Sequence, residues 1–329
     1  MNAISCSHAD KLPLNFTGQS CDFSIKGISI VAPQSPIDSI ALQPIVDINA
    51  NSISLMPYAF CTMENPEVRY NQHGQHWGEN IDGVIGCIKL AHQKNISVML
   101  KPHLWIGHGV YTGAFTLSTE KEWQIWEASY QKYMLHFAAI ADSMKAEIFC
   151  IGTELGTSIK ERPQFWNSFI DTIKEIFHGK LTYAANWDDY KNFPFWQKLD
   201  YIGIDAYFPL VDDETPDKNS LIKAWKKYID ELQKLSTQIN RPVLFTEYGY
   251  RNVDHATAEP WKESEGNQNN KAQANAYEAF YQSFAGKKWF AGGYVWKWYV
   301  DDGRHRKREI DFTPQEKPAA KVIEKWYHN

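Results

Sequence analysis

The stretch "PVLFTEYGY", Pro242–Tyr250, ends a strand-like run on a glutamate. Val243 and Phe245 are typical of buried β-strands, and aromatic residues and a glycine follow Glu247. An ionised carboxylate in such a place is costly unless it is paired or used in chemistry. This run therefore predicts a buried strand that carries a carboxylate to a place where its charge is needed.

Seven further runs of the same kind lie along the chain. Each is short and apolar, and polar or turn-forming residues separate it from the next segment. The runs cover residues 23–32, 51–60, 96–105, 146–155, 180–189, 200–209 and 290–299.

The segments between these runs have the spacing of amphipathic helices. In 118–144, large apolar residues recur three and four positions apart, and Ser118 or Thr119 followed by acidic residues predicts a capping box. Connection 190–199 has room for no more than a turn of helix. Further helical patterns cover 79–95, 162–178, 218–239, 269–287 and the closing segment 314–329.

Eight strands that alternate with helical segments predict an α/β fold, a single (β/α)₈ TIM barrel. We expect a flexible, polar arm over residues 1–22 and one barrel domain over 23–329. The length of 329 residues is ordinary for one large barrel, and 43% hydrophobic with 22% charged residues is typical of a globular protein.

The charge pattern narrows the choice of partners. Lys and Arg number 34 and Asp and Glu number 39, which gives a net charge of −5 without a basic stripe. Nucleic acid and membrane surfaces are therefore not expected as partners. The start of the chain lacks the charged and apolar regions of a secretory signal, so the default expectation is a cytoplasmic location unless a leader was removed.

The five cysteines do not predict a disulfide framework or a structural zinc site. They are odd in number and none forms a CxxC pair. Cys87 and Cys150 lie in apolar contexts and are expected to be small buried side chains, and the remaining cysteines are Cys6, Cys21 and Cys61.

The ends of the predicted strands carry an unusual number of polar and aromatic residues. In (β/α)₈ barrels the loops after the strands converge at one face, where the chemistry takes place. The residues at these ends are Lys101, His103, Trp105, Glu154, Asn186, Trp187, Asp205, Tyr207, Glu247, Trp296 and Trp298.

Side chains on a strand alternate between faces, and Glu154 shares its face with Cys150 and Gly152 on that rule. Glu247 likewise shares its face with Val243 and Phe245. We therefore expect these residues to line the barrel and both glutamates to lean over its mouth. The fourth and seventh strands of a ring of eight lie nearly opposite each other, so the two carboxylates can approach across the centre.

Two facing carboxylates suit the hydrolysis of glycosides. One must be protonated to give a proton to the leaving oxygen, and the other must be charged to attack or to activate water. The alternative is a structural role, in which both glutamates are ion-pair partners of Lys101, Lys297 or Arg251.

At this point the chain resembles the retaining glycosidases of clan A, and more narrowly glycoside hydrolase family 113, the β-1,4-mannanases. The resemblance runs in order from residue 26 to about residue 327. The matching stretches are "KGISI" (26–30), "LKPH" (100–103), "IGTEL" (151–155), "DYIGIDAYFPL" (200–210), "FTEYGY" (245–250), "GGYVWKWY" (292–299) and "DFTPQEKPA" (311–319).

The resemblance implies that Glu154 is the acid/base and Glu247 the nucleophile of a double displacement. Their carboxyl oxygens would then lie about 5–5.5 Å apart. Many clan members carry an asparagine before the acid/base glutamate that contacts the sugar 2-hydroxyl, whereas this chain has Thr153. Either Thr153 is adequate, or His103 or Asn186 makes that contact.

The implied substrate is a β-linked oligo- or polysaccharide of the mannan type. Tyr207 is expected to donate to Glu247, and Trp296 to form the floor under the sugar that is attacked. Core packing is the alternative for each tryptophan. The full set of expected substrate-binding residues is Lys101, His103, Trp105, Asn186, Trp187, Asp205, Tyr207, Trp296 and Trp298.

No metal or cofactor is predicted. The histidines at 73, 76, 103 and 108 lack the HExxH spacing, and the chain has no GxGxxG after a strand, P-loop or GxSxG elbow. Two alternatives remain open: a β-glycosidase for glucan, galactan or xylan, and an inactive barrel that only binds carbohydrate. Whether the loops 61–80 and 251–268 leave an open cleft, and so endo or exo action, also stays open.

Overall fold

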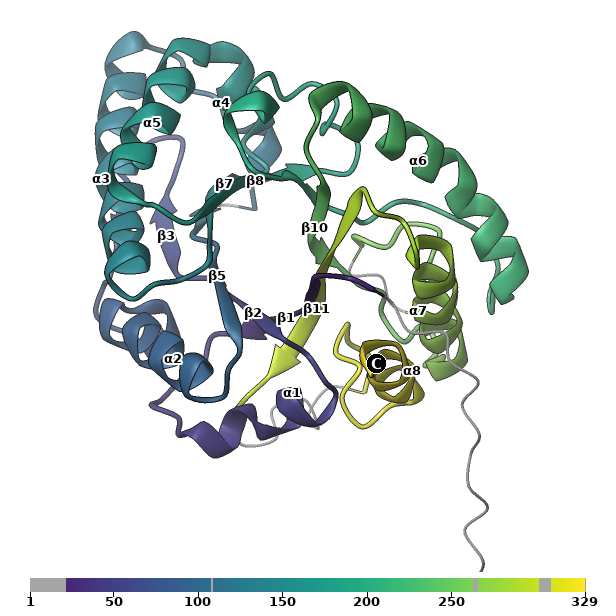
Figure 1. Ribbon diagram of the computed structural model, residues 1–329. Helices are drawn as coiled ribbons and strands as arrows, with labels where there is room; N and C mark the ends of the chain where they lie inside the picture. The colour runs from purple at the N-terminus through teal and green to yellow at the C-terminus, as the bar shows by residue number, and fades with distance from the viewer. Residues whose placement is uncertain (1–21, 108, 263–265, 302–308, 329) are drawn as a thin grey trace, which may run out of the picture.

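The computed structural model describes residues 22–107, 109–262, 266–301 and 309–328. These residues form a closed barrel of parallel strands in the order β1-β11-β10-β9-β8-β7-β5-β2, with helices around it (Figure 1). The predicted (β/α)₈ barrel is therefore confirmed. The barrel strands are β1 (Ile25–Val31), β2 (Ser52–Leu55), β5 (Ser97–Leu100), β7 (Ile148–Thr153), β8 (Lys180–Asn186), β9 (Ile202–Asp205), β10 (Val243–Tyr248) and β11 (Phe290–Tyr299).

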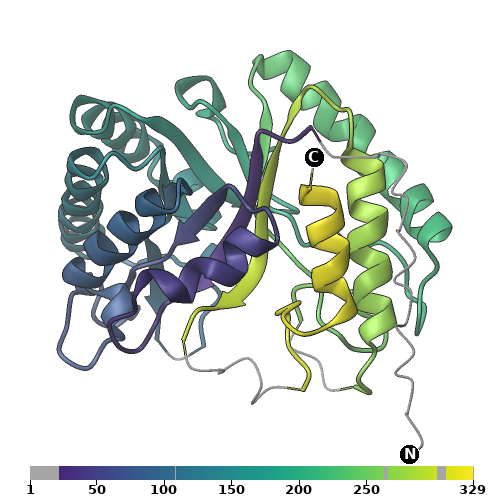
Figure 2. The ribbon, with the colours of Figure 1, turned by 60° about the horizontal axis from the view of Figure 1, so that its bottom comes forward.

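The helices lie outside the ring and cover the strands from all sides (Figures 1 and 2). The described α-helices are α1 (Gln43–Asp47), α2 (Ile81–Gln93), α3 (Glu120–Ser143), α4 (Gly156–Glu161), α5 (Pro163–Ile176), α6 (Lys218–Ile239), α7 (Asn270–Phe284) and α8 (Pro318–Tyr327). Short 3₁₀ helices are η1 (Ser39–Leu42), η2 (Trp77–Glu79), η3 (Thr112–Ala114) and η4 (Trp196–Lys198). Connection 190–199 holds only η4, as expected.

Local signals set the helix ends. The capping box predicted before α3 is present, because the Thr119 hydroxyl accepts from the Glu122 amide and the Glu122 carboxylate accepts from the Thr119 amide. Asp217 caps α6 in a similar way. At its other end α6 stops at Asn240, whose φ of 56° is left-handed.

Two predicted strands are each split by a proline. The runs 51–60 and 96–105 were expected to be single strands, but β2 ends before Pro57 and β5 ends before Pro102. Proline has no N–H to give to a ladder, so the barrel pairing stops there. The chain then forms a second, three-stranded sheet in the order β4-β3-β6, built from β3 (Tyr58–Cys61), β4 (Arg69–Tyr70) and β6 (His103–Ile106).

The apolar residues form two separate clusters. The smaller one comes only from barrel strands and lies inside the ring, and Tyr201 packs against it. Its members are Ile25, Met99, Ile148, Leu244, Ala291 and Tyr294. The larger cluster lies between the strands and the helices. Phe245 belongs to it, because its ring packs on Trp225 and Phe284.

The expectation that Val243 and Phe245 line the barrel is therefore wrong. Leu244 faces the interior, and a register shift between Phe245 and Glu247 against β9 brings Glu247 inward as well. A β-bulge of this kind adds a residue and resets the alternation of faces. Strict alternation from Phe245 would have turned Glu247 away from the barrel.

A similar irregularity lies in β7. Its register against β8 shifts between Cys150 and Thr153. A Cβ on Gly152 would meet the Trp166 ring and the Tyr130 hydroxyl, so this position faces the helices, and the expectation that it lines the barrel is wrong. The backbone of Glu154 is left-handed, with φ at 52°. Both glutamates therefore reach the mouth through local departures from regular strand geometry.

The last helix is tied to the first strand. The buried Lys26 ammonium donates to the Tyr327 carbonyl at 2.9 Å, and the Tyr327 hydroxyl donates to the Gly27 carbonyl at 3.1 Å. The hydroxyls of Tyr248 and Tyr327 are 3.2 Å apart. These bonds join β1, β10 and α8 on the inner side of that helix.

Some expectations fall outside the described residues. The predicted arm over 1–22 does so except for Asp22, as do Cys6, Cys21 and His108. Within the described residues, Cys87 and Cys150 are buried free thiols, as expected. No helix in the same ranges is long and apolar enough to cross a membrane.

The barrel interior makes a stability prediction. Leu244→Ala removes a fully buried side chain from a small cluster with little room to collapse. We expect a loss of roughly 2–5 kcal/mol in the free energy of unfolding, measured by urea denaturation. Ile40→Ala is the matched control, because Ile40 is 74% exposed and its truncation should change stability by less than about 0.5 kcal/mol. Equal losses in both variants would contradict the assignment of Leu244 to a packed interior.

Candidate active site

A cavity of about 560 Å³ lies at the C-terminal mouth of the barrel, and both glutamates line it. Glu154 follows β7, and Glu247 lies within β10, with β8 and β9 between them. The chain thus brings together two carboxylates that are far apart in sequence. Six other residues expected at the site line the same cavity: His103, Asn186, Trp187, Asp205, Tyr207 and Trp296.

Glu247 is held by two donors. The Lys101 ammonium donates to Oε1 in a short contact, and the Tyr207 hydroxyl donates to Oε2 at 2.9 Å, the contact expected from the sequence. His103 Nε2 lies 3.6 Å from Oε1. Each carboxylate oxygen therefore has a fixed partner, which sets the orientation of the side chain.

The pKa of Glu247 is raised to about 7. Burial is the largest cause and the charge of Asp205 the next, while the Lys101 charge and the bonds from Lys101 and Tyr207 act in the opposite direction. The ionised form thus depends on its two donors.

Glu154 has a different environment. Among the described residues no group donates a hydrogen bond to its carboxylate, and its side chain is largely buried. Burial, followed by the charges of Asp205 and Glu247, raises its pKa well above the ordinary value. The protonated form of Glu154 is therefore favoured relative to an exposed glutamate, and this is the form that a proton donor needs.

Lys101 does not contact the cavity, contrary to expectation. Its side chain is 0% exposed, and its ammonium is bound to both oxygens of Asp205, at 2.9 and 3.1 Å, as well as to Glu247. It sits beneath the cavity because β5 ends just before it. The Lys101 ammonium, expected to contact substrate, is thus paired with two carboxylates of the protein.

His103 is neutral in this setting. Burial and the positive charge of Lys101 lower its pKa well below the ordinary value. Its Nε2 makes no hydrogen bond with any described residue, and neither does the buried hydroxyl of Thr153, which also lines the cavity. Two buried polar atoms beside the cavity are thus left without a partner, and a small side-chain movement would be needed to bring either into contact with a bound molecule.

Aromatic rings form part of the cavity wall. Trp187 and Trp261 stack with ring centroids 5.1 Å apart, and both line the cavity together with Trp296. A Cβ on Gly249 would collide with the Trp296 carbonyl, so the glycine of "FTEYGY" permits this close approach. Flat aromatic faces beside carboxylates favour a ligand with apolar ring faces and polar edges.

Two tryptophans lie elsewhere than expected. Trp298 is 4% exposed and belongs to the large cluster between strands and helices, so core packing is the correct interpretation for it. Trp105 is 57% exposed on β6 and lines neither this cavity nor the one beside it.

A second cavity of about 720 Å³ adjoins the first. It shares Tyr111, Glu154, Asn186 and Asp188 with the first cavity, but Glu247 does not line it. Its walls come from α4 and from the segment after β8. Polar side chains that line it further out include Thr157, Lys160, Asp189 and Asn192.

Several residues that line the cavity lie outside the expected site set, Leu104 and Thr112 among them. Asp188 follows Asn186 and Trp187 at the end of a predicted strand, and this position was a usable signal. Tyr111 lies in the loop after β6, where no periodicity marks it. Phe312 lines the cavity from the segment between β11 and α8, although the stretch "DFTPQEKPA" that contains it did stand out.

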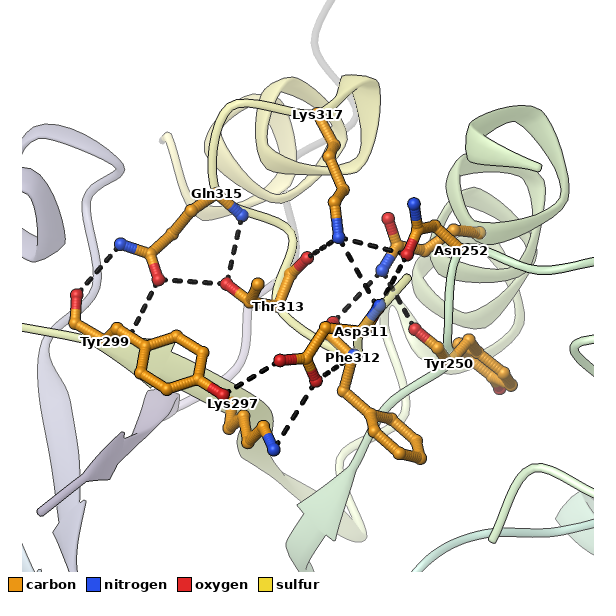
Figure 3. Close-up of polar contacts among 10 residues, drawn as sticks. Tyr250, Asn252, Lys297, Tyr299, Asp311, Phe312, Thr313, Gln315 and Lys317 are labelled. Carbon is orange, nitrogen blue, oxygen red and sulfur yellow. Dashed lines mark hydrogen bonds and ion pairs between the residues drawn. The ribbon is translucent and has the colours of Figure 1, made fainter. Parts of the chain in front are cut away.

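A buried polar network holds the segment that carries Phe312 (Figure 3). The Asp311 carboxylate accepts from the Tyr299 hydroxyl at 2.8 Å and lies 3.4 Å from the Lys297 ammonium. The Lys317 ammonium donates to Asn252 Oδ1 at 3.0 Å and to a neighbouring carbonyl, and burial lowers its pKa to about 8. These bonds hold the segment that places Phe312 in the wall of the cavity.

Within the described residues, no group of three or more His, Cys, Asp or Glu side chains could hold a metal ion. The cavity instead offers one buried carboxyl group with a raised pKa and a second carboxylate held by two donors, at the mouth of a (β/α)₈ barrel with aromatic walls. This arrangement is that of a glycoside hydrolase, which needs one carboxyl group as acid and another as base or nucleophile.

The chain belongs to glycoside hydrolase family 113, whose sequence profile matches residues 37–328. It is therefore a glycoside hydrolase. Among curated proteins, none matches the chain significantly.

Solved structures share the fold. The family 113 β-mannanase AaManA from Alicyclobacillus acidocaldarius, in complex with ManMIm, is 23% identical with a TM-score of 0.81, over 93% of this chain and 97% of that one. A family 113 β-1,4-mannanase is 23% identical with a TM-score of 0.79, over 94% of this chain and 100% of that one. A β-glucuronidase from Faecalibacterium prausnitzii is 14% identical with a TM-score of 0.60, over 93% of this chain and 49% of that one.

The raised pKa of Glu154 predicts a pH-dependent stability. A carboxyl group with a higher pKa in the folded than in the unfolded state destabilises the fold as pH rises through that interval. Glu154→Gln should therefore raise the melting temperature at pH 8, by roughly 2–4 °C for each kcal/mol gained, and have a smaller effect at pH 4. The exposed Glu175 supplies the control, Glu175→Gln. A stabilisation by Glu154→Gln that is the same at both pH values would argue against the raised pKa.

Proposed function

We propose that this chain hydrolyses β-1,4-mannosidic bonds in mannan or manno-oligosaccharides by a retaining, two-step displacement. The observation that carries the proposal is the unequal environment of the two glutamates in one cavity: Glu247 has two fixed donors, whereas Glu154 has none among the described residues. The mannan specificity draws on structures of the same family, which are described as β-mannanases.

In the first step the Glu247 carboxylate attacks the anomeric carbon. The bond from that carbon to the glycosidic oxygen breaks, and Glu154 gives its proton to the leaving oxygen. The products are a glycosyl ester on Glu247 and a shortened glycan with a free hydroxyl. The donors Lys101 and Tyr207 support this step because they hold Glu247 in its charged form and in one orientation.

In the second step Glu154 acts as a base. Ester formation removes the charge of Glu247, which is one of the causes that raise the pKa of Glu154. The pKa of Glu154 then falls, so its ionised form is favoured and can act as a base towards water. It takes a proton from a water molecule, whose oxygen attacks the anomeric carbon and releases Glu247.

The sugar under attack would sit between Trp296 and the carboxylates. Thr153 and His103 each offer a buried polar atom that lacks a hydrogen-bond partner among the described residues. An axial hydroxyl such as the mannose 2-hydroxyl would supply that partner to one of them. Thr153 or His103 would then make the contact that an asparagine makes in many members of the clan.

The second cavity supports cleavage within a chain rather than only at its end. The acid/base group must stand beside the bond to the leaving sugar, and Glu154 is shared by both cavities while Glu247 is not. The glycan on the leaving side would therefore extend past Glu154 towards Asp189 and Asn192. Sugar units on both sides of the cleaved bond are what endo action requires.

The direct test is product release from mannohexaose and from β-1,4-mannan. We expect short manno-oligosaccharides from wild type, and a fall of kcat by several orders of magnitude in Glu247→Gln. Chromatography of the products separates endo from exo action, since mannose alone would indicate exo action. If wild type leaves both substrates intact but cleaves a β-glucan, galactan or xylan, the mannan assignment is wrong. If it cleaves none of these, a barrel that only binds carbohydrate becomes the better account.

The roles of the two glutamates can be separated with an activated substrate. A 2,4-dinitrophenyl β-mannoside has a leaving group that needs no proton, so Glu154→Ala should still form the glycosyl ester and then stall. Added azide should restore turnover and give a β-mannosyl azide, identified by NMR. Glu247→Ala should not respond in this way with a β-azide product. An α-mannosyl azide from the Glu154 variant would contradict the two-step mechanism.

A further inference from the structure

We infer that Lys101 and Asp205 form a buried counterion unit that positions Glu247 and sets the charge balance of both glutamates, so that this pair fixes the pH range of the reaction. The inference rests on the proposed function of the two glutamates. Lys101 is thus a positioning residue, and the substrate contact first expected of it is replaced by an action through Glu247.

The geometry of the unit is well defined. The Lys101 ammonium is within hydrogen-bond distance of both Asp205 oxygens, at 2.9 and 3.1 Å, and it also donates to Glu247. The Thr246 hydroxyl donates to Asp205 Oδ1 at 2.8 Å and fixes the far side of the pair. Lys101 directly follows β5, Asp205 ends β9, and Thr246 and Glu247 belong to β10, so three neighbouring parts of the barrel hold these groups in place.

The burial of these groups gives the pair its strength. Lys101 is 0% exposed and Asp205 is 1% exposed, so water cannot screen their charges. A lysine in such a place would lose its charge unless it had a partner, and Asp205 provides one. The pKa of Lys101 is accordingly raised by Asp205 and Glu247 against the effect of burial.

Asp205 and Lys101 act on the two glutamates with opposite sign. The charge of Asp205 is the first electrostatic cause that raises the pKa of Glu154 and of Glu247, whereas the charge of Lys101 lowers both. With the pair intact, the negative charge of Asp205 and the positive charge of Lys101 oppose each other at Glu247, whose pKa is raised to about 7. Loss of either partner alone would unbalance the site.

Other groups face this unit from the neighbouring elements. Tyr58 on β3 and His103 on β6 lie on one side, and Cys150 of β7 is near the ammonium. Glu154 and Asp188 contribute negative charge, and Tyr207 contributes a hydroxyl. Burial raises the pKa of the Cys150 thiol to about 11 and keeps Tyr58 and Tyr207 protonated, while His103 is neutral. Among the described residues, Lys101 is the cation whose charge lowers the pKa of both glutamates.

The test compares two variants that remove one charge each. Asp205→Asn preserves shape and removes the charge that raises both carboxyl pKa values, so both limbs of the kcat/KM profile on mannohexaose should move to lower pH. Lys101→Met removes the balancing cation, so both limbs should move to higher pH, with a fall in kcat of roughly 10²-fold from lost positioning. Shifts of about one pH unit or more are expected for charges this close.

The double variant and a remote control sharpen the comparison. In Lys101→Met with Asp205→Asn, the two opposite effects should largely cancel and return the limbs towards their wild-type positions. Asp230→Asn removes the same charge from the exposed face of α6 and should leave the profile unchanged. If folded variants lose kcat while both limbs stay in place, Lys101 and Asp205 have only a structural role and the inference is overturned.

A direct titration keeps the inference separate from the proposed function. Carbon-13 NMR of glutamate-labelled protein without substrate can follow both carboxyl groups, and Glu154→Gln and Glu247→Gln identify their signals. The Glu247 signal should titrate at lower pH in Asp205→Asn than in wild type. The same titration midpoint in both proteins would overturn the inference, whatever the substrate is. If Lys101→Met does not fold, Asp205→Asn and the double variant still decide the outcome.

Discussion

Closure of the strand ring is the constraint on which the rest of the molecule depends. β1 pairs in parallel with β2 on one side and with β11 on the other, so the sheet has no free edge in the barrel. Because all barrel strands run the same way, their carboxyl ends meet at one rim. Residues from Lys101 to Trp296 thus surround one centre. Without closure, β7 and β10 would lie on one open sheet and their glutamates would not face a common cavity.

The barrel interior is divided between packing and chemistry. The part away from the cavity holds the small apolar cluster that includes Leu244 and Tyr294. The part at the C-terminal ends of the strands holds Lys101, Asp205 and Glu247. Apolar side chains in this second part would make a more stable protein, because buried ion pairs seldom repay the cost of leaving water. The charged groups are retained at the expense of stability, as is common where a fold carries out chemistry.

Much of this arrangement could be predicted from the sequence. The eight strand runs and the main helices follow from periodicity and capping, and Glu154 and Glu247 stand out because carboxylates at strand ends are rare without a purpose. The predicted alternation of faces was wrong at Phe245, because a bulge is one added residue and leaves no periodic trace. Eight of the eleven residues expected at the mouth nonetheless line the cavity, since strand ends converge there whatever the alternation.

Other errors have equally local causes. Pro57 and Pro102 could have been recognised as ends of barrel strands, but the second sheet that follows them depends on pairing between distant segments. Lys101 was interpreted as a substrate contact because its depth in the barrel depends on where β5 ends. Tyr111 and Phe312 reach the cavity from loops, whose paths are set by networks such as the one around Asp311. The roles assigned to the two glutamates stay predictions.

The bond from Lys26 to Tyr327 spans 301 positions of sequence. During synthesis, β1 leaves the ribosome early and then has no neighbour on one side until β11 has emerged. Throughout that time the edge of β1 is open, and the Tyr327 carbonyl that accepts from Lys26 in the folded protein has not been synthesised. Nascent chains of this protein therefore expose a strand edge for most of their elongation, and such edges are what chaperones and aggregating partners recognise. The contacts that seal the barrel are among the last to become available.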